Sequence, residues 1–359
     1  MRRLLTPCFA LLGALSLLLG TLPAHADPQD PERADRALGW LEAQLTNGML
    51  EQFPGHQDYG LTLDMVLSMR AAGATPAEVR PILDAMGGIT ESQLEYEGQP
   101  TTGMVGKALV AAHVSGYPVD DFHGKDLVAM ARGAIDEDGR VDGGDTDAEN
   151  IFSQAFVLIG LSQQGDVPPH AVDFLVDQQC EAGYFRLYYS DGQTCDEAGG
   201  GYDVDGTVLA LFALEAALDA GHDVSEALDL GRRWLVDEQG ESGGFTGSSS
   251  TPSENSNSTG LAVAALAEHH PEAAAKSAAW VASLMYSEGP DVGAVAYRAV
   301  DHDGWAVGEA LTNAQRSGAI RATPQAVLAF APTNYAFINA PARGSSGGIL
   351  RPGLPPTGC

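Results

Sequence analysis

Basic residues are scarce in this chain. Its 359 residues include 19 Lys and Arg but 48 Asp and Glu, which gives a formal net charge of −29 at pH 7. A field of this sign repels phosphate backbones and anionic lipid headgroups, so we expect neither nucleic acid nor a membrane surface as a partner. It favours neutral or cationic ligands. The same charge also suits a protein that simply has to stay soluble in salt.

Long apolar runs are absent except near the N-terminus. Two arginines open the chain, an apolar run follows at residues 11–22, and Ala24-His25-Ala26 matches the small-x-small pattern of a cleavage site. We therefore predict a signal peptide over residues 1–26 and a secreted, extracellular or cell-wall protein, with no membrane insertion after cleavage. An N-terminal membrane anchor is the alternative, but the run is short for a membrane span.

Cysteine is also rare, with four residues in the chain. Cys8 lies in the predicted signal peptide and Cys359 is the last residue. Cys180 and Cys195 remain as a local pair, and in an exported chain a disulfide is the natural interpretation. A metal site is the alternative, although the pair lacks a nearby histidine and a second pair of cysteines.

A repeated pattern fills most of the chain. Six apolar, Ala- and Gly-rich segments lack a polar face and are expected to be helices buried on both sides. Amphipathic segments precede them, for example at residues 33–45, 170–179 and 231–239. Alternation of the two kinds predicts an all-α fold, an (α/α)6 toroid of six helical hairpins over residues 27–332. The apolar segments are anchored at Tyr59, Thr102, Glu149, Thr207, Thr259 and Thr323.

The amphipathic segments end in a shared motif, Gln-x-x-x-Gly-x-aromatic or leucine. The glutamine is expected to bond main-chain groups of the adjoining turn, the glycine to permit a left-handed helix stop, and the last residue to fill the gap between hairpins. The three copies are Gln44, Gly48 and Leu50; Gln179, Gly183 and Phe185; and Gln239, Gly243 and Phe245. This motif resembles the QW repeat of squalene–hopene cyclases. Together with the six helix pairs, the motif makes residues 31–332 resemble the terpenoid cyclase and protein prenyltransferase α/α-toroid superfamily. Within it, the chain resembles a secreted bacterial prenyltransferase and squalene oxidase repeat protein.

Asp and Asn residues precede the apolar segments at matching positions. Such residues cap helix N-termini, because their side chains accept hydrogen bonds from free N–H groups. In a toroid the inner helices start at one end, so the caps would also surround the cavity mouth, where the resemblance places ligands. The candidate ligand-binding residues are Asp145 and Asp147, Asp203 and Asp205, and Asn255 and Asn257.

Two further segments have alternative interpretations. The acidic stretch 136–149 fits an EF-hand frame with Asp138 first and Glu149 twelfth, but Arg140 falls where a ligand oxygen is needed, so calcium is an alternative to the absence of any cofactor. Residues 333–359 are predicted to be a flexible Gly/Pro-rich tail. Leu354-Pro355-Pro356-Thr357-Gly358 in that tail resembles a sortase motif, which would imply linkage to a Gram-positive cell wall.

Known catalytic signatures are incomplete in this chain. Asp203-Val204-Asp205 is followed by Gly206, whereas the resembling cyclases complete a D-x-D-D motif, and aromatic residues are only 7% of the chain. The zinc ligands of prenyltransferases are missing too. We therefore expect a binding module for a small molecule, glycan or peptide, with no assigned catalytic residue. The alternative is an extracellular terpenoid-cyclase-like or lyase-like enzyme that uses Asp203 and Asp205.

Overall fold

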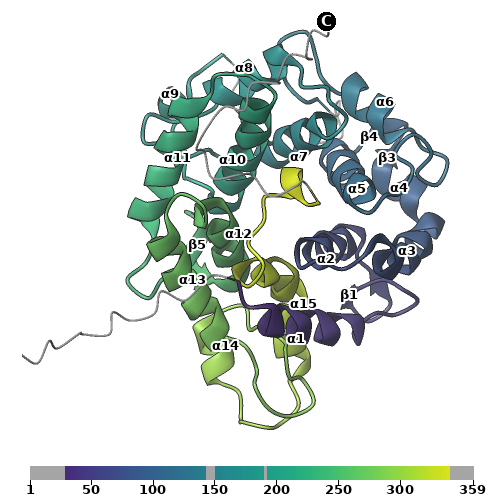
Figure 1. The fold of residues 1–359 in the computed structure, drawn as a ribbon, viewed down its shortest axis with the longest axis vertical. Helices are drawn as coiled ribbons and strands as arrows, with labels where there is room; N and C mark the ends of the chain where they lie inside the picture. Colours follow the sequence, from purple (N-terminus) through teal and green to yellow (C-terminus); the bar gives the residue numbers. More distant parts are fainter. Residues whose placement is uncertain (1–28, 143–149, 190–191, 340–359) are drawn as a thin grey trace, which may run out of the picture.

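The computed structural model describes residues 29–142, 150–189 and 192–339, which form a helical toroid (Figure 1). Six helices make a closed inner ring, because each contacts the next along the chain and the last contacts the first. They are α2 (Tyr59–Ala71), α5 (Thr102–Val114), α7 (Ile151–Ser162), α10 (Val204–Asp219), α12 (Ser256–Leu266) and α15 (Asn313–Ala326). The outer helices are α1 (Pro31–Glu42), α3 (Pro76–Ala85), α6 (Leu127–Gly133), α8 (Pro169–Asp177), α11 (Ser225–Glu238) and α13 (Pro271–Ser283). The predicted toroid of six hairpins is confirmed.

Burial separates the two sets of helices as their sequence patterns predict. Ten of the twelve residues of α7 are buried, because neighbouring helices pack against it on more than one side. In the outer helix α11 only five of fourteen residues are buried. The inner helices approach one another closely at small residues. A Cβ atom on Gly106 of α5 would lie 2.7 Å from the backbone nitrogen of Val157 on α7.

The repeated glutamine motif joins consecutive hairpins. The side-chain amide of Gln179 donates to the carbonyl oxygens of Gly183 and of Ala227 on the next outer helix, both at 2.9 Å. Gly183 has a φ of 108°, and Phe185 is fully buried between the helices. Gln239 repeats the arrangement against α13. The predicted structural role is therefore confirmed for these two copies, whereas the side-chain amide of Gln44 donates back to the carbonyl oxygen of Trp40 on α1.

Two further copies of this turn escaped the sequence analysis. Gly139 and Gly293 both have positive φ and lie against the next outer helix, where a Cβ atom would come within 2.1 Å and 2.2 Å of main-chain oxygens. Buried valines follow each of them, at Val141 and Val295. Both copies lack the glutamine, which is why the pattern search missed them.

Short elements fill the connections between hairpins. Three antiparallel strand pairs join outer to inner helices: β1 (Glu51–Phe53) with β2 (His56–Gln57), β3 (Glu95–Tyr96) with β4 (Gln99–Pro100), and β5 (Phe245–Ser248) with β6 (Thr251–Asn255). The remaining helical turns are η1 (Met86–Gly88), α4 (Thr90–Leu94), α9 (Cys195–Ala198), α14 (Ala299–Asp303), η2 (Val327–Ala329) and η3 (Tyr335–Phe337). Within the described part of the chain, no helix is both long and apolar enough to cross a membrane.

The predicted disulfide is present. Cys180 follows α8, Cys195 begins α9, and their Cα atoms lie 4.9 Å apart. Thr194 is the N-cap of α9, and its side chain forms a capping box with that of Glu197. The disulfide thereby links the turn after α8 to α9, which precedes α10.

Two sequence assignments need correction. The toroid does not end at residue 332, because residues 333–339 follow η2 into the ring and Tyr335 is 1% exposed. The anchor of α7 was also misplaced. Its N-cap is Asn150, which accepts a hydrogen bond from the N–H group of Ser153 at 3.1 Å. The acidic residues that we aligned as its cap precede this position.

Candidate ligand-binding site

The first members of two of the three pairs, Asp203 and Asn255, are helix caps. Asp203 accepts a hydrogen bond from the N–H group of Gly206 at 2.7 Å, and Asn255 accepts one from Ser258 at 2.9 Å. These bonds satisfy free donors at the starts of α10 and α12. Burial raises the pKa of Asp203, and the bond from Gly206 opposes this effect. Asp203 and Asn255 therefore have structural partners without a ligand.

The second members of these two pairs have a different environment. Asp205 and Asn257 occupy equivalent positions in the first turns of α10 and α12. Oδ1 of each side chain is buried, and no hydrogen bond from the described residues reaches either atom. Both residues are nevertheless partly accessible as a whole. Two adjacent inner helices thus present unsatisfied acceptors at the same end of the ring.

Asp205 has a strongly perturbed carboxyl group. Burial raises its pKa from 3.8 to about 7, and the charge of Asp203 adds to the increase. A hydrogen bond with Ser258 opposes these effects, and the charge of Asp64 raises the pKa slightly further. The carboxyl group is consequently divided between its neutral and charged forms near pH 7.

A buried ion pair lies on the opposite inner helices. Asp64 of α2 is 8% exposed, and its Oδ1 lies 2.8 Å from Nζ of Lys107 on α5. Burial raises the pKa of Asp64, although the charge of Lys107 lowers it. Nζ of Lys107 also lies 5.4 Å from the ring centroid of Phe156 on α7. Asp64 and Lys107 make this side of the ring interior polar, and because their charges are opposite they add little net charge to it.

Gly206 explains why the acidic motif is incomplete. A Cβ atom at this position would lie 2.5 Å from Cγ2 of Ile151, so a larger residue would displace the start of α7. The fourth residue of a D-x-D-D motif therefore does not fit here as the helices are packed. Asp205 lacks the neighbouring carboxyl group that this motif would provide.

The remaining acidic candidates do not form a site in the described residues. Asp145 and Asp147 lie outside them, as does the end of the predicted calcium loop at Glu149. At the start of that loop, Asp136 accepts hydrogen bonds from the N–H groups of Asp138 and Arg140, both at 2.9 Å. Across the ranges described, no group of three or more His, Cys, Asp or Glu residues is arranged to hold a metal ion.

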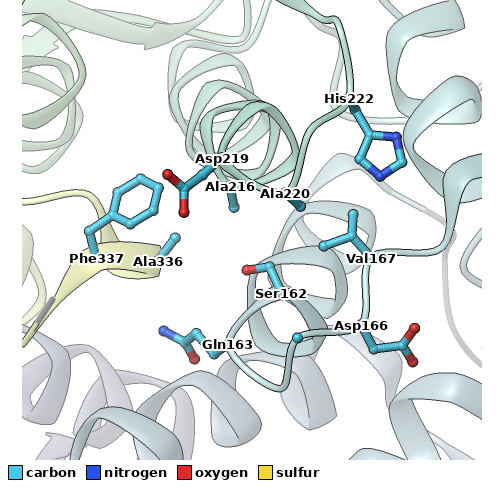
Figure 2. Close-up of a pocket in the computed structure, with 11 residues that line it drawn as sticks. Ser162, Gln163, Asp166, Val167, Ala216, Asp219, Ala220, His222, Ala336 and Phe337 are labelled. Carbon is cyan, nitrogen blue, oxygen red and sulfur yellow. The ribbon is translucent and has the colours of Figure 1, made fainter. Parts of the chain in front are cut away.

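A hollow of about 620 Å³ lies at the other end of the ring, where α7 and α10 finish (Figure 2). Figure 2 shows the side chains of Asp219 and Phe337 on one side of it and that of Asp166 on the other. Asp166 forms an ion pair with Arg132 at 2.6 Å. This hollow is separated from Asp205 by most of the length of α10.

Three solved structures share this architecture at low sequence identity. The apo type II terpene cyclase MstE from Scytonema has a TM-score of 0.55 and 15% identity, over 82% of this chain and 97% of its own. A protein from Actinoplanes gives 0.56 and 16%, over 84% and 100%. An inactive variant of the α-1,6-mannanase GH76A from Salegentibacter, in complex with α-1,6-mannotriose, gives 0.58 and 12%, over 83% and 99%. These likenesses confirm the resemblance to the α/α-toroid fold of terpenoid cyclases.

No protein-family model and no curated protein sequence matches the chain. The assignment of a site therefore depends on the geometry of the ring itself. Asp205 and Asn257, both predicted from the sequence as candidates, lie in the first turns of two adjacent inner helices. Asp64 and Lys107 were not predicted as a pair, because each lies alone within an apolar helical segment and only the packing of α2 against α5 makes them neighbours.

Proposed function

We propose that this protein binds a small neutral ligand bearing hydroxyl groups, such as a glycan, inside the ring between α10 and α12. The observation that carries the proposal is the pair of buried acceptors without donors, Oδ1 of Asp205 and Oδ1 of Asn257. A buried acceptor without a partner costs free energy, which a donating ligand recovers. Sugar hydroxyl groups are such donors.

Charge supports a neutral ligand over an ionic one. The net charge of −29 repels anions. A cation is disfavoured because Asp205, with a pKa of about 7, is only partly charged at neutral pH, and Asp64 is already paired with Lys107. The mannanase that shares the fold was solved with a neutral trisaccharide, which makes neutral oligosaccharides the first probes to use.

Isothermal titration calorimetry with a panel of neutral oligosaccharides, including α-1,6-mannotriose, tests the proposal. We expect Asp205→Ala and Asn257→Ala each to weaken binding by about fivefold, since a hydrogen bond contributes about 1 kcal/mol. Asp237→Ala is the matched control, because Asp237 is exposed on α11. Equal affinities in all four proteins, or no binding by the wild type, would refute the proposal.

An enzyme that uses Asp205 as a general acid is the second candidate. The pKa of about 7 favours it, because a carboxyl group that is protonated near neutral pH is able to donate a proton. Asp205→Asn separates the two functions. The amide keeps an acceptor but has no acidic proton, so a binding protein retains most of its affinity, whereas an enzyme that still binds its oligosaccharide stops releasing product.

Export is part of the same proposal. The predicted signal peptide at residues 1–26 would place the ring outside the cytoplasm, with the tail available for cell-wall linkage. The disulfide between Cys180 and Cys195 supports an oxidising environment. N-terminal sequencing of the protein from its host tests this part, with Asp27 expected as the first residue and an uncleaved Met1 as the contrary result.

A further inference from the structure

The C-terminal part of the described chain closes one end of the ring. Residues 331–339, here called the C-terminal strap, follow η2 and carry η3 into contact with α7 and α10. Figure 1 shows η3 in yellow inside the ring, beside these two helices. The strap lies at the ends of the inner helices opposite to the caps Asp203 and Asn255.

Polar contacts hold the strap to four inner helices. Val114 is the last residue of α5, so its carbonyl group has no partner inside the helix, and a strap side chain binds it. The contacts run from Asn334 Nδ2 to Phe212 O (3.2 Å) and Glu215 Oε2 (2.7 Å), from Gln163 Nε2 to Tyr335 O (3.0 Å), from Asn339 Nδ2 to Val114 O (2.8 Å), and from the Arg70 guanidinium to Asn339 Oδ1. The strap is therefore seated by specific contacts.

Tyr335 is the residue that the strap inserts into the ring. Its ring stacks against Phe156 with centroids 6.2 Å apart and meets Phe212 edge-on at 5.5 Å. The residue is 1% exposed, yet its hydroxyl group has no hydrogen-bond partner in the parts of the chain that are described. Phenylalanine would make the same aromatic contacts, so packing does not account for the hydroxyl group.

The hydroxyl group shares the ring interior with the proposed site. Burial raises the pKa of Tyr335 well above its usual value, and the charges of Asp64 and Asp205 raise it further. Geometry agrees with this: the Phe156 ring that stacks on Tyr335 also has Nζ of Lys107, the partner of Asp64, 5.4 Å from its centroid. Tyr335 therefore lies beside the polar interior of the ring. Its hydroxyl group stays protonated at neutral pH and is available as a donor.

We propose that Tyr335 donates a hydrogen bond to the ligand, so that the C-terminal strap forms the floor of the binding site. This inference rests on the proposed function, and it narrows the class of ligand. The ligand must donate to Asp205 and Asn257 and must also accept from Tyr335. A sugar or polyol does both through its hydroxyl groups. A hydrocarbon does neither, and an ammonium group only donates.

Tyr335→Phe tests the inference because it removes only the oxygen atom. In calorimetry with the same oligosaccharide panel, we expect Tyr335→Phe to weaken binding by about three- to tenfold. Tyr286→Phe is the matched control. Tyr286 is also buried, but its hydroxyl group donates to the carbonyl oxygen of Asp301, at 3.4 Å, in the α14 region. This control should keep the wild-type affinity.

Thermal unfolding without ligand gives a second readout. Because the hydroxyl group of Tyr335 has no acceptor in the free protein, Tyr335→Phe should unfold at the wild-type temperature or above it, whereas its ligand-induced shift should shrink. If Asp205→Ala weakens binding but Tyr335→Phe does not, the inference is wrong and the proposed function stands. If the wild type binds no member of the panel, both fail.

Discussion

Asp205→Asn should stabilise the protein at neutral pH and leave its stability unchanged near pH 4. The carboxyl group titrates at 3.8 in its ordinary state and at about 7 in the folded protein, because burial and the charge of Asp203 disfavour its ionised form. Between these values the folded state holds a proton that the unfolded state has released, so the free energy of unfolding falls as pH rises. Above pH 7 the loss is complete.

The magnitude follows from the size of the shift. The pKa difference of about 3 between the folded and unfolded states corresponds to about 4 kcal/mol of unfolding free energy, at 1.36 kcal/mol for each pKa unit. This is an upper figure, because Asp205 is partly accessible to water, which screens its charge. Asn keeps an acceptor and cannot ionise, so the difference between variant and wild type should grow from zero at pH 4 to about 2–4 kcal/mol at pH 8.

Urea unfolding of both proteins at several pH values measures this difference directly. Taking the difference removes the titration of groups that do not interact with Asp205, so the remaining pH dependence belongs to Asp205 and the carboxyl groups coupled to it, Asp203 and Asp64. Asp237→Asn, at an exposed position on α11, should follow the wild type at every pH. A difference between Asp205→Asn and wild type that does not change with pH would refute the buried, proton-holding carboxyl group.

Three further perturbations test the ring itself, each by urea unfolding at pH 7 against the wild type. Replacing Cys180 and Cys195 with serine should cost about 3 kcal/mol, since the bond closes a loop of about 15 residues, and an unchanged midpoint would contradict this. Gln179→Ala should cost about 1–3 kcal/mol, because it removes two hydrogen bonds to main-chain carbonyl groups, one within its own turn and one to the next hairpin; a change below 0.5 kcal/mol would contradict this link. Lys107→Met should cost about 3–5 kcal/mol by leaving Asp64 buried and unpaired, and a second change, Asp64→Leu, should restore much of it; no recovery in the double variant would contradict the pairing.

The sequence was sufficient for the architecture because the signals of the toroid are local and repeated. A helix such as α10, which is apolar on all sides and rich in small residues, is stable only where other helices bury it on more than one side. A glycine such as Gly183 is required where the backbone adopts a positive φ in close contact with the next hairpin. The disulfide followed from the scarcity of cysteine. The cap positions of α10 and α12 were also correct, since Asp203 and Asn255 start their helices directly.

The interior site was only half predictable. Asp205 and Asn257 stood out because they sit two residues after a cap in matching repeats. Lys107 did not, since one lysine in an apolar helix has no pattern, and its partner lies on another hairpin. Tyr335 was assigned to the tail because Gly and Pro follow it closely, although tertiary contacts with Phe156 and Phe212 seat it in the ring.

A crystal structure with the tightest-binding oligosaccharide of the panel tests the central claim most directly. The account predicts sugar density in the ring interior, with hydroxyl groups within hydrogen-bonding distance of Oδ1 of Asp205, Oδ1 of Asn257 and the hydroxyl group of Tyr335. Density in the hollow of Figure 2 or on the outer surface, with the interior atoms still without partners, would contradict it.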